Sequence, residues 1–277
     1  MARTDRTKKS SALNFADPRF KVGAEIVGPV TPPPVRYKTS AATQKKLLDT
    51  AERLFSRWGY AAVSIRDVTS AAGMRVANVS YYFGNKQNLY HEVLRRRAEP
   101  LSHTRLQRIR AARSLKGNRQ LKLRALVAAF TDPALELSQS GNAGWKNFFA
   151  LIGQVAFTGF SVPQVYEFFN EPARQLMAAI HELYPSAKTA DIQAATLLLI
   201  GAYLMVIAET GRIETFADGR FSSSDLNFLG PLMKEFIAGG IHGMLEASSK
   251  KPRRRFAGGA HPGFANGRPR SRIERNA

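Results

Sequence analysis

Residues 64–86 of the chain read SIRDVTSAAGMRVANVSYYFGNK, and the rest of the sequence is organised around this stretch. Ile65, Val68 and Ala72 recur at i, i+3 and i+7, which places them on one face of a short helix. Gly73 interrupts that pattern, and a glycine readily adopts the positive φ that a sharp turn between helices needs. Because apolar periodicity resumes after this turn, the stretch is predicted to form a helix-turn-helix.

Polar residues and a second glycine mark the ends of the two helices. Ser64 is a suitable N-cap for the first helix, and Asp67 places negative charge in its first turn, where the helix dipole is positive. The second helix is expected to run from about Val76 to Gly84. Asn85 is then a suitable N-cap for a further helix.

The second helix of the pair has one apolar and one polar face. Val79 and Phe83, at i and i+4, are predicted to pack against the first helix. The opposite face carries basic, amide, hydroxyl and aromatic side chains: Arg75, Asn78, Ser80, Tyr81 and Tyr82. Such side chains reach base edges and phosphates, and Lys86, near the start of the next helix, can hold a phosphate together with backbone amides. We therefore predict that this pair of helices binds DNA.

The wider stretch from Thr43 to Leu89 resembles the DNA-binding domain of the TetR/AcrR family of bacterial transcriptional regulators. That family has a Thr-led first helix with an Ala and a Leu-Phe pair, then a Gly and a Thr/Ser-initiated second helix. A Gly turn follows, and the third helix closes in an aromatic-aromatic-Phe run with a Lys three residues later. The matching residues are Thr43, Ala51, Leu54, Phe55, Gly59, Ser64, Gly73, Tyr81, Tyr82, Phe83 and Lys86. One position departs, because Ser80 stands where the family often has Tyr, so that phosphate contact is shorter or lost.

The resemblance implies a set of DNA-facing positions. We predict them to be Ser64, Arg66, Arg75, Val76, Ala77, Asn78, Ser80, Tyr81, Tyr82 and Lys86. Replacing Arg75 or Asn78 by Ala should relax base preference, whereas Tyr82→Ala or Lys86→Ala should weaken binding to all sequences. Phe83 is predicted to be buried in the core. Burial in the core is also the alternative to DNA contact for Tyr81 and Tyr82.

Charge is divided unevenly along the chain, whose formal net charge is +20. Residues 41–115 hold 14 basic and 5 acidic side chains, whereas residues 116–249 hold 10 and 12. The two ends are basic: residues 1–40 are predicted to form a disordered arm and residues 250–277 a disordered tail, each either touching DNA or merely solvated. This division favours a DNA-binding head, residues 41–100, on a body with another task, residues 101–249.

The body is predicted to be helical throughout, which makes the fold class all-α. Proline should kink or end the helix from Lys86 near Ala98, and another helix should bend or end at Pro133. The intervening run of three arginines, residues 95–97, is expected to be a solvated face or a phosphate contact.

Two late helices, near residues 189–210 and 225–248, are assigned to a homodimer interface. The first contains an apolar run of about 15 residues, shorter than a membrane span of roughly 20, and an all-round apolar helix in a soluble chain must be buried on more than one side. The last two helices build the dimer interface in the resembling family. A hydrophobic effector pocket is predicted at Phe148, Phe149, Phe157, Phe169 and Tyr203, with ordinary core packing as the alternative.

The function that we predict is a homodimeric regulator, more often repressor than activator, which binds a near-palindromic operator and responds to an unidentified small molecule in the bacterial cytoplasm. No catalytic motif, metal site or cofactor fingerprint is found, and the chain has no cysteine. A membrane is not among the expected partners. The alternative is a nonspecific nucleic-acid-binding or architectural protein that acts through its basic ends.

Overall fold

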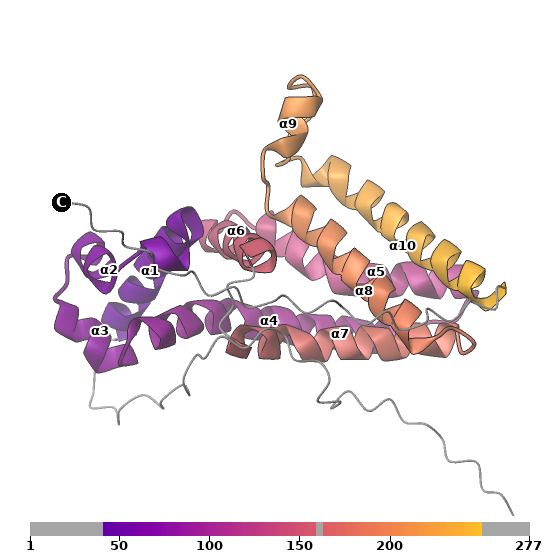
Figure 1. The fold of residues 1–277 in the computed structure, drawn as a ribbon, viewed down its shortest axis with the longest axis horizontal. Coiled ribbons are helices and arrows are strands. Elements are labelled where there is room, and N and C mark those ends of the chain that lie inside the picture. The colour runs from indigo at the N-terminus through magenta and orange to yellow at the C-terminus, as the bar shows by residue number, and fades with distance from the viewer. Residues whose placement is uncertain (1–40, 159–162, 251–277) are drawn as a thin grey trace, which may run out of the picture.

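The computed structural model describes residues 41–158 and 163–250, and the regular elements in those ranges are all α-helices (Figure 1). They are α1 Ala41–Ala62, α2 Ile65–Ala72, α3 Val76–Phe83, α4 Lys86–Arg113, α5 Arg119–Ser138, α6 Ala143–Thr158, α7 Pro163–Leu183, α8 Thr189–Ile207, α9 Arg212–Phe216 and α10 Leu226–Lys250. The predicted all-α class is confirmed. The predicted basic arm and tail lie outside the described residues, except for Lys250 at the end of α10.

The helices α1, α2 and α3 form a head at one end of the molecule, and α4 leads from it into the body (Figure 1). The core of the head is apolar and almost fully buried: Leu47, Ala51, Phe55, Val68, Ala72, Val79 and Phe83. Trp58, near the end of α1, lies outside this core and is 59% exposed. Gly59 leaves the helical conformation at φ 76° and turns the chain away directly after it.

Four of the described helices, α4, α5, α7 and α10, contain an internal proline. The sequence predicts that α4 will either kink or end near Ala98. The helix does not end there, because it runs past Pro100 to Arg113. Buried residues on both sides of the proline, Ala98 and Leu101 among them, hold the helix in place, and Pro100 itself is exposed. Likewise α5 continues beyond Pro133, and Pro172 lies inside α7.

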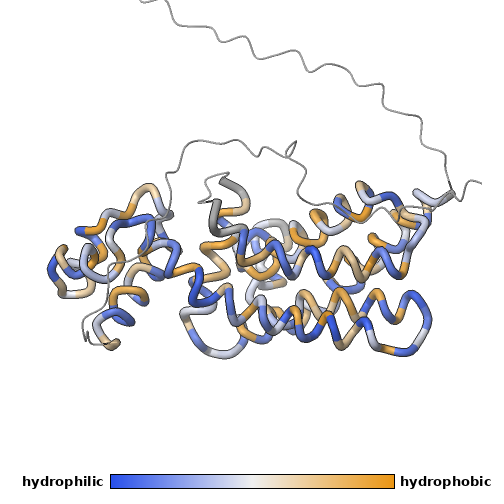
Figure 2. The backbone as a smooth tube through the Cα atoms, turned by 90° about the horizontal axis from the view of Figure 1, so that it is seen from below, coloured by the Kyte–Doolittle hydropathy of each residue, from blue (hydrophilic) through white to orange (hydrophobic). Residues whose placement is uncertain are grey.

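In the body, α5 and α7 pack against α4, whereas α10 packs against α5 and α8, and α8 also contacts α7; α6 lies between the body and α1. In Figure 1, α8 and α10 run side by side. Figure 2 shows apolar and polar residues alternating along these helices, as amphipathic packing requires. Asp225 caps α10, accepting from the backbone amide of Phe228 at 3.1 Å. The short helix α9 was not predicted from the sequence.

Candidate nucleic-acid interface

The first helix of the pair, α2, begins with a reciprocal capping box. The Ser64 Oγ accepts from the backbone amide of Asp67 at 3.1 Å, and the Asp67 Oδ2 accepts from the backbone amide of Ser64 at 2.8 Å. The hydrogen bonds from Ser64 hold the pKa of the Asp67 carboxyl below its usual value. The cap predicted from sequence is therefore confirmed, and it fixes where the recognition unit starts.

The turn between the two helices depends on Gly73. Its φ of 64° and ψ of 41° are left-handed, and its amide donates back to the carbonyls of Thr69 and Ser70. No atom lies within 4 Å of the position that a Cβ would occupy, so the backbone conformation, rather than lack of space, favours glycine here. This turn sets the angle at which α3 leaves α2.

The recognition helix α3 separates its residues as the sequence predicts. Val79 and Phe83 are buried at 0% and 1% exposure and hold α3 against the head. Among the predicted DNA-facing residues, those exposed are Ser64, Arg66, Arg75, Val76, Ala77, Ser80 and Tyr81, and those partly buried are Asn78, Tyr82 and Lys86. All ten lie on α2 and its N-cap, the turn, α3 and the first residue of α4, and none is fully buried.

The two tyrosines of α3 have different surroundings. Tyr81 is 47% exposed, whereas Tyr82 is partly buried and packs against the core of the head. Their rings meet edge to face with centroids 5.2 Å apart. The exposed Tyr81 side chain can therefore contact a partner. The Tyr82 ring can contact a partner only through its exposed edge, because the rest of the ring packs on the core.

The start of α4 positions a cation beside α3. The Asn85 side chain accepts from the backbone amide of Asn88 at 2.8 Å, which confirms the predicted cap. The Lys86 Nζ lies 4.3 Å from the centroid of the Tyr60 ring, and burial lowers the pKa of this ammonium group despite the nearby Asp67 carboxylate. The cation is therefore held in place at a helix N-terminus, where a phosphate also finds free backbone amides.

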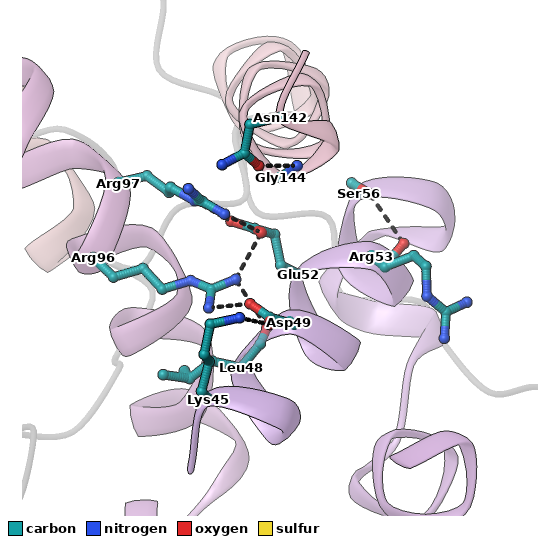
Figure 3. Close-up of polar contacts among 10 residues, drawn as sticks. All are labelled: Lys45, Leu48, Asp49, Glu52, Arg53, Ser56, Arg96, Arg97, Asn142 and Gly144. Atoms are coloured by element: carbon teal, nitrogen blue, oxygen red, sulfur yellow. Dashed lines mark hydrogen bonds and ion pairs between the residues drawn. The ribbon is translucent and has the colours of Figure 1, made fainter. Parts of the chain in front are cut away.

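An ion cluster that was not predicted from the sequence joins the head to α4. Asp49 and Glu52 on α1 face Arg96 and Arg97 on α4, and we call these four residues the Glu52 cluster (Figure 3). The Glu52 side chain is 2% exposed and accepts from Arg96 Nη2 at 2.6 Å and from Arg97 Nε at 3.0 Å. Arg96 Nη1 also donates to Asp49 Oδ1 at 2.7 Å.

The prediction that the arginine run is a solvated face or a phosphate contact is therefore wrong. Arg96 and Arg97 are partly buried on Glu52, and Arg95 pairs with Glu92 and Glu99 on its own helix. Burial raises the pKa of the Glu92 carboxyl, but His91 and Arg95 together lower it to about 2, so the group is charged. A carboxylate within the apolar stripe of α1 was the sequence signal for this cluster, since a buried acid needs a cation.

The same cluster reaches the body through α6. The Arg97 guanidinium lies 5.0 Å from the centroid of the Trp145 ring. Gly144 permits this approach, because a Cβ there would stand 1.9 Å from Arg97 Nη2. Further along α6, Gln154 Nε2 donates to the carbonyl of Ser56 at 2.6 Å. The head is thus held to the body by polar contacts from both α4 and α6.

The residues of the predicted effector pocket are only partly brought together. Phe148 and Phe149 are 1% exposed with ring centroids 5.4 Å apart, and Phe169 lies 6.5 Å from Phe148. Tyr203 packs elsewhere, 6.1 Å from the ring of Phe130. The side chain of the fifth residue, at position 157, lies outside the described part. The described rings pack on one another, so a ligand that reaches them must separate them.

A hollow of about 610 Å³ lies between α8 and α10 and is lined almost entirely by apolar residues. Three large side chains at this hollow are exposed in the single chain, namely Leu197 at 70%, Leu198 at 65% and Phe236 at 75%. We call these three residues the α8–α10 face. A contiguous apolar surface of this kind marks an interaction site.

Two family models match the chain in succession. The model described as bacterial regulatory proteins, tetR family, matches residues 47–93, and the model described as tetracyclin repressor-like, C-terminal domain, matches residues 128–240. A solved tetR-family regulator from Streptomyces coelicolor is 16% identical, with a TM-score of 0.48 over 77% of this chain and 84% of that chain.

Two curated proteins are similar over a shorter stretch. The chain is 33% identical over 67 residues to the HTH-type transcriptional repressor KstR2 of Rhodococcus jostii (strain RHA1), covering 24% of this chain and 33% of that protein. It is 32% identical over 63 residues to the probable HTH-type transcriptional regulator YttP of Bacillus subtilis (strain 168), covering 23% and 30%. The chain thus spans about a third of the length of the curated relatives it matches. With its helix-turn-helix and both family domains in order, the chain belongs to the TetR family of transcriptional regulators.

Proposed function

We propose that the chain is a ligand-responsive repressor that binds a near-palindromic operator as a homodimer. The observation that carries this proposal is the polar face of α3, which projects basic, amide and phenol groups from a buried apolar base. Regulators of this family bind operators, dimerise and carry a C-terminal ligand-binding domain. We extend each of these three properties to this chain.

The ten predicted positions become the proposed DNA contact. Arg75 and Asn78, near the start of α3, read base edges in the major groove, where amide and guanidinium groups match adenine and guanine. Tyr81, Tyr82 and Lys86 contact the DNA backbone on either side of the bases that are read. The Ser64 Oγ serves the capping box, so its contribution is to place the end of α2 near a phosphate.

The α8–α10 face is the proposed dimer interface. Leucine and phenylalanine side chains that are more than half exposed in the single chain would be buried between two copies, at a gain of about 25 cal/mol per Å² of apolar surface. By length and composition α8 could also cross a membrane, although 44% of its most apolar window is already buried inside the protein. We assign α8 to the dimer, because burial on one side and an apolar hollow on the other suit a second copy.

We accordingly assign residues 41–100 to DNA binding and residues 101–249 to effector binding and dimerisation. Two recognition helices in such a dimer would stand about 34–36 Å apart, one helical turn of DNA. We place the protein in the bacterial cytoplasm, associated with the nucleoid through its DNA, since regulators of this family are soluble cytoplasmic proteins.

The proposal is tested by truncation and competition. The full chain and a version limited to residues 41–249 are compared on a selected site and on random DNA at physiological salt. The proposal expects the shortened chain to keep its preference for the selected site. If the preference disappears with the two basic ends, and the remaining binding collapses as salt rises, the protein is a nonspecific binder instead.

A further inference from the structure

The middle of α4 carries an arginine in an unusual place. Arg105 is 3% exposed and lies among the helices of the body. Its Nε donates to the carbonyl of Phe130 on α5 at 2.8 Å. Its guanidinium carbon lies 4.2 Å from the centroid of the Phe130 ring and 5.0 Å from that of Tyr203 on α8.

No carboxylate in the described part of the chain pairs with Arg105, and its Nη2 is buried without a hydrogen-bond acceptor. Other arginines of the same helix are paired: Arg95 with Glu92, Arg97 with Glu52, Arg108 with Glu136 and Arg113 with Glu182. Arginine stays charged in proteins, and a buried charge is costly unless a counter-charge or a full set of hydrogen bonds meets it. The body therefore holds a buried cation that hydrogen-bonds the Phe130 carbonyl and the Tyr203 side chain but has no counter-charge among the described residues.

Carboxylates on α5 and just beyond α8 are engaged elsewhere. On α5, Asp132 accepts from Lys234 at 2.8 Å, and Glu136 takes both Nη groups of Arg108. Just beyond α8, Glu209 pairs with Lys146 at 3.2 Å. The one ionisable group stacked on Arg105 is the Tyr203 phenol, whose pKa burial raises, so it stays neutral. The missing negative charge has to come from outside the described chain.

We propose that Arg105 is the group that recognises the effector, and that the effector is an organic anion with an apolar body. A carboxylate or a phosphate monoester would supply the acceptor for Nη2 through a charge-assisted hydrogen bond. The rings of Phe130 and Tyr203 would then meet the apolar body of the ligand. This inference rests on the proposed ligand-responsive function and gives its ligand a chemical class.

The position of Arg105 also gives the ligand a connection to the head. Arg105 follows Arg97 by eight residues on α4, which corresponds to about 12 Å along the helix. Arg97 belongs to the Glu52 cluster, which holds the head. A ligand that moves Arg105 away from the Phe130 carbonyl therefore acts on the helix that carries both contacts.

The test is a titration calorimetry series with the full chain. The anionic probes are octanoate, 1-naphthoate and octyl phosphate, and the neutral probes of matched shape are octanamide and 1-naphthamide. We expect at least one anion to bind, and its neutral counterpart to bind roughly tenfold or more weakly. Tighter binding of octyl phosphate than of octanoate would identify a phosphate ligand, and the reverse order a carboxylate. Binding of none of the three anions, or equal binding of an anion and its amide, would overturn the proposal.

A variant pair sharpens the result. Arg105→Met should weaken anion binding roughly tenfold or more while binding of the amides is unchanged. Arg108→Met removes a partly exposed arginine one turn away and should leave anion binding within about threefold. If Arg105→Met fails to fold, Arg105→Lys replaces it, because it keeps the positive charge. The ratio of anion affinity to amide affinity, measured on the wild-type chain, then decides the question alone. These titrations contain no DNA, so failure of operator binding and failure of the ligand assignment are read separately.

Discussion

Two surfaces of the molecule are left uncovered in the single chain, and they differ in chemistry. The face of α3 exposes arginine, serine and tyrosine around a half-buried asparagine, Asn78. The α8–α10 face exposes Leu197, Leu198 and Phe236 above an apolar hollow. Exposure alone does not identify a partner, but its chemistry does: the first surface suits a polyanion with hydrogen-bonding edges, and the second suits another apolar surface.

The two surfaces also differ in how far their structure follows from local sequence. The caps at Ser64 and Asn85 and the turn at Gly73 involve residues within three or four positions of one another, so the sequence predicts them correctly. The α8–α10 face joins residues about 40 positions apart. Its apolar character follows from the sequence, whereas the pairing of the two helices was expected from the family resemblance.

The largest expected effect concerns the Glu52 cluster, which joins the head that carries α3 to the body that carries the α8–α10 face. Glu52→Ala would leave Arg96 and Arg97 without the buried carboxylate that holds them, and removal of one partner of a buried pair costs about 3–5 kcal/mol of unfolding free energy. Urea denaturation measures this loss. Asp49→Ala is the matched control, because Asp49 is 43% exposed and its loss should cost at most about 1 kcal/mol. Equal losses would show that the cluster does not depend on Glu52.

A charge on the α8–α10 face should separate the dimer. Leu198→Glu places a carboxylate where two copies are proposed to meet, so sedimentation should show a monomer. Operator affinity should fall roughly 100-fold, since the two heads no longer act together. Leu115→Glu alters a leucine that is 40% exposed at the end of α4 and should leave the dimer intact. A Leu198→Glu variant that remains dimeric would remove this face from the account.

The base-reading assignment of α3 predicts a change in preference rather than a uniform loss. Asn78→Ala or Arg75→Ala should cost about 1–3 kcal/mol on the preferred site and much less on random DNA. Competition binding on both DNAs measures the ratio. If Asn78→Ala lowers affinity equally on specific and random DNA, then Asn78 does not read a base.

Loss of a contact with the DNA backbone should have the smallest effect on binding, and this effect should be the same for every DNA sequence. Lys86→Ala is expected to weaken binding roughly fivefold to tenfold on every DNA and to reduce the salt dependence by about one ion. Tyr82→Phe removes the hydroxyl but keeps the packing of the ring, so it should weaken binding without changing stability. A loss confined to one DNA sequence would move either residue into the base-reading set.

The sequence predicts the helix-turn-helix more fully than the rest, for physical reasons. Val79 and Phe83 have local periodicity that fixes their burial. The Glu52 cluster joins residues 44 and 45 positions apart, and no periodicity within one helix indicates such a pair. Pro100 was expected to weaken α4, but tertiary packing along the helix outweighs the hydrogen bond that is lost.

The body shows the same limit in another form. The aromatic residues near Phe148 were predicted from composition, which cannot distinguish a ligand pocket from a packed core. Arg105 was not singled out, because its burial and its lack of a carboxylate partner depend on how α4, α5 and α8 come together. Charge compensation is a property of the folded chain.

The most direct test of the central claim is selection of bound sequences from a random DNA pool with the purified full chain at physiological salt. A dimer that presents two α3 helices one turn of DNA apart predicts enrichment of an inverted repeat with half-sites about 10 base pairs apart. Such a repeat would also supply the probe for the variants above. A pool that shows no enrichment, with binding that disappears as salt rises, would contradict the account and assign the DNA affinity to charge alone.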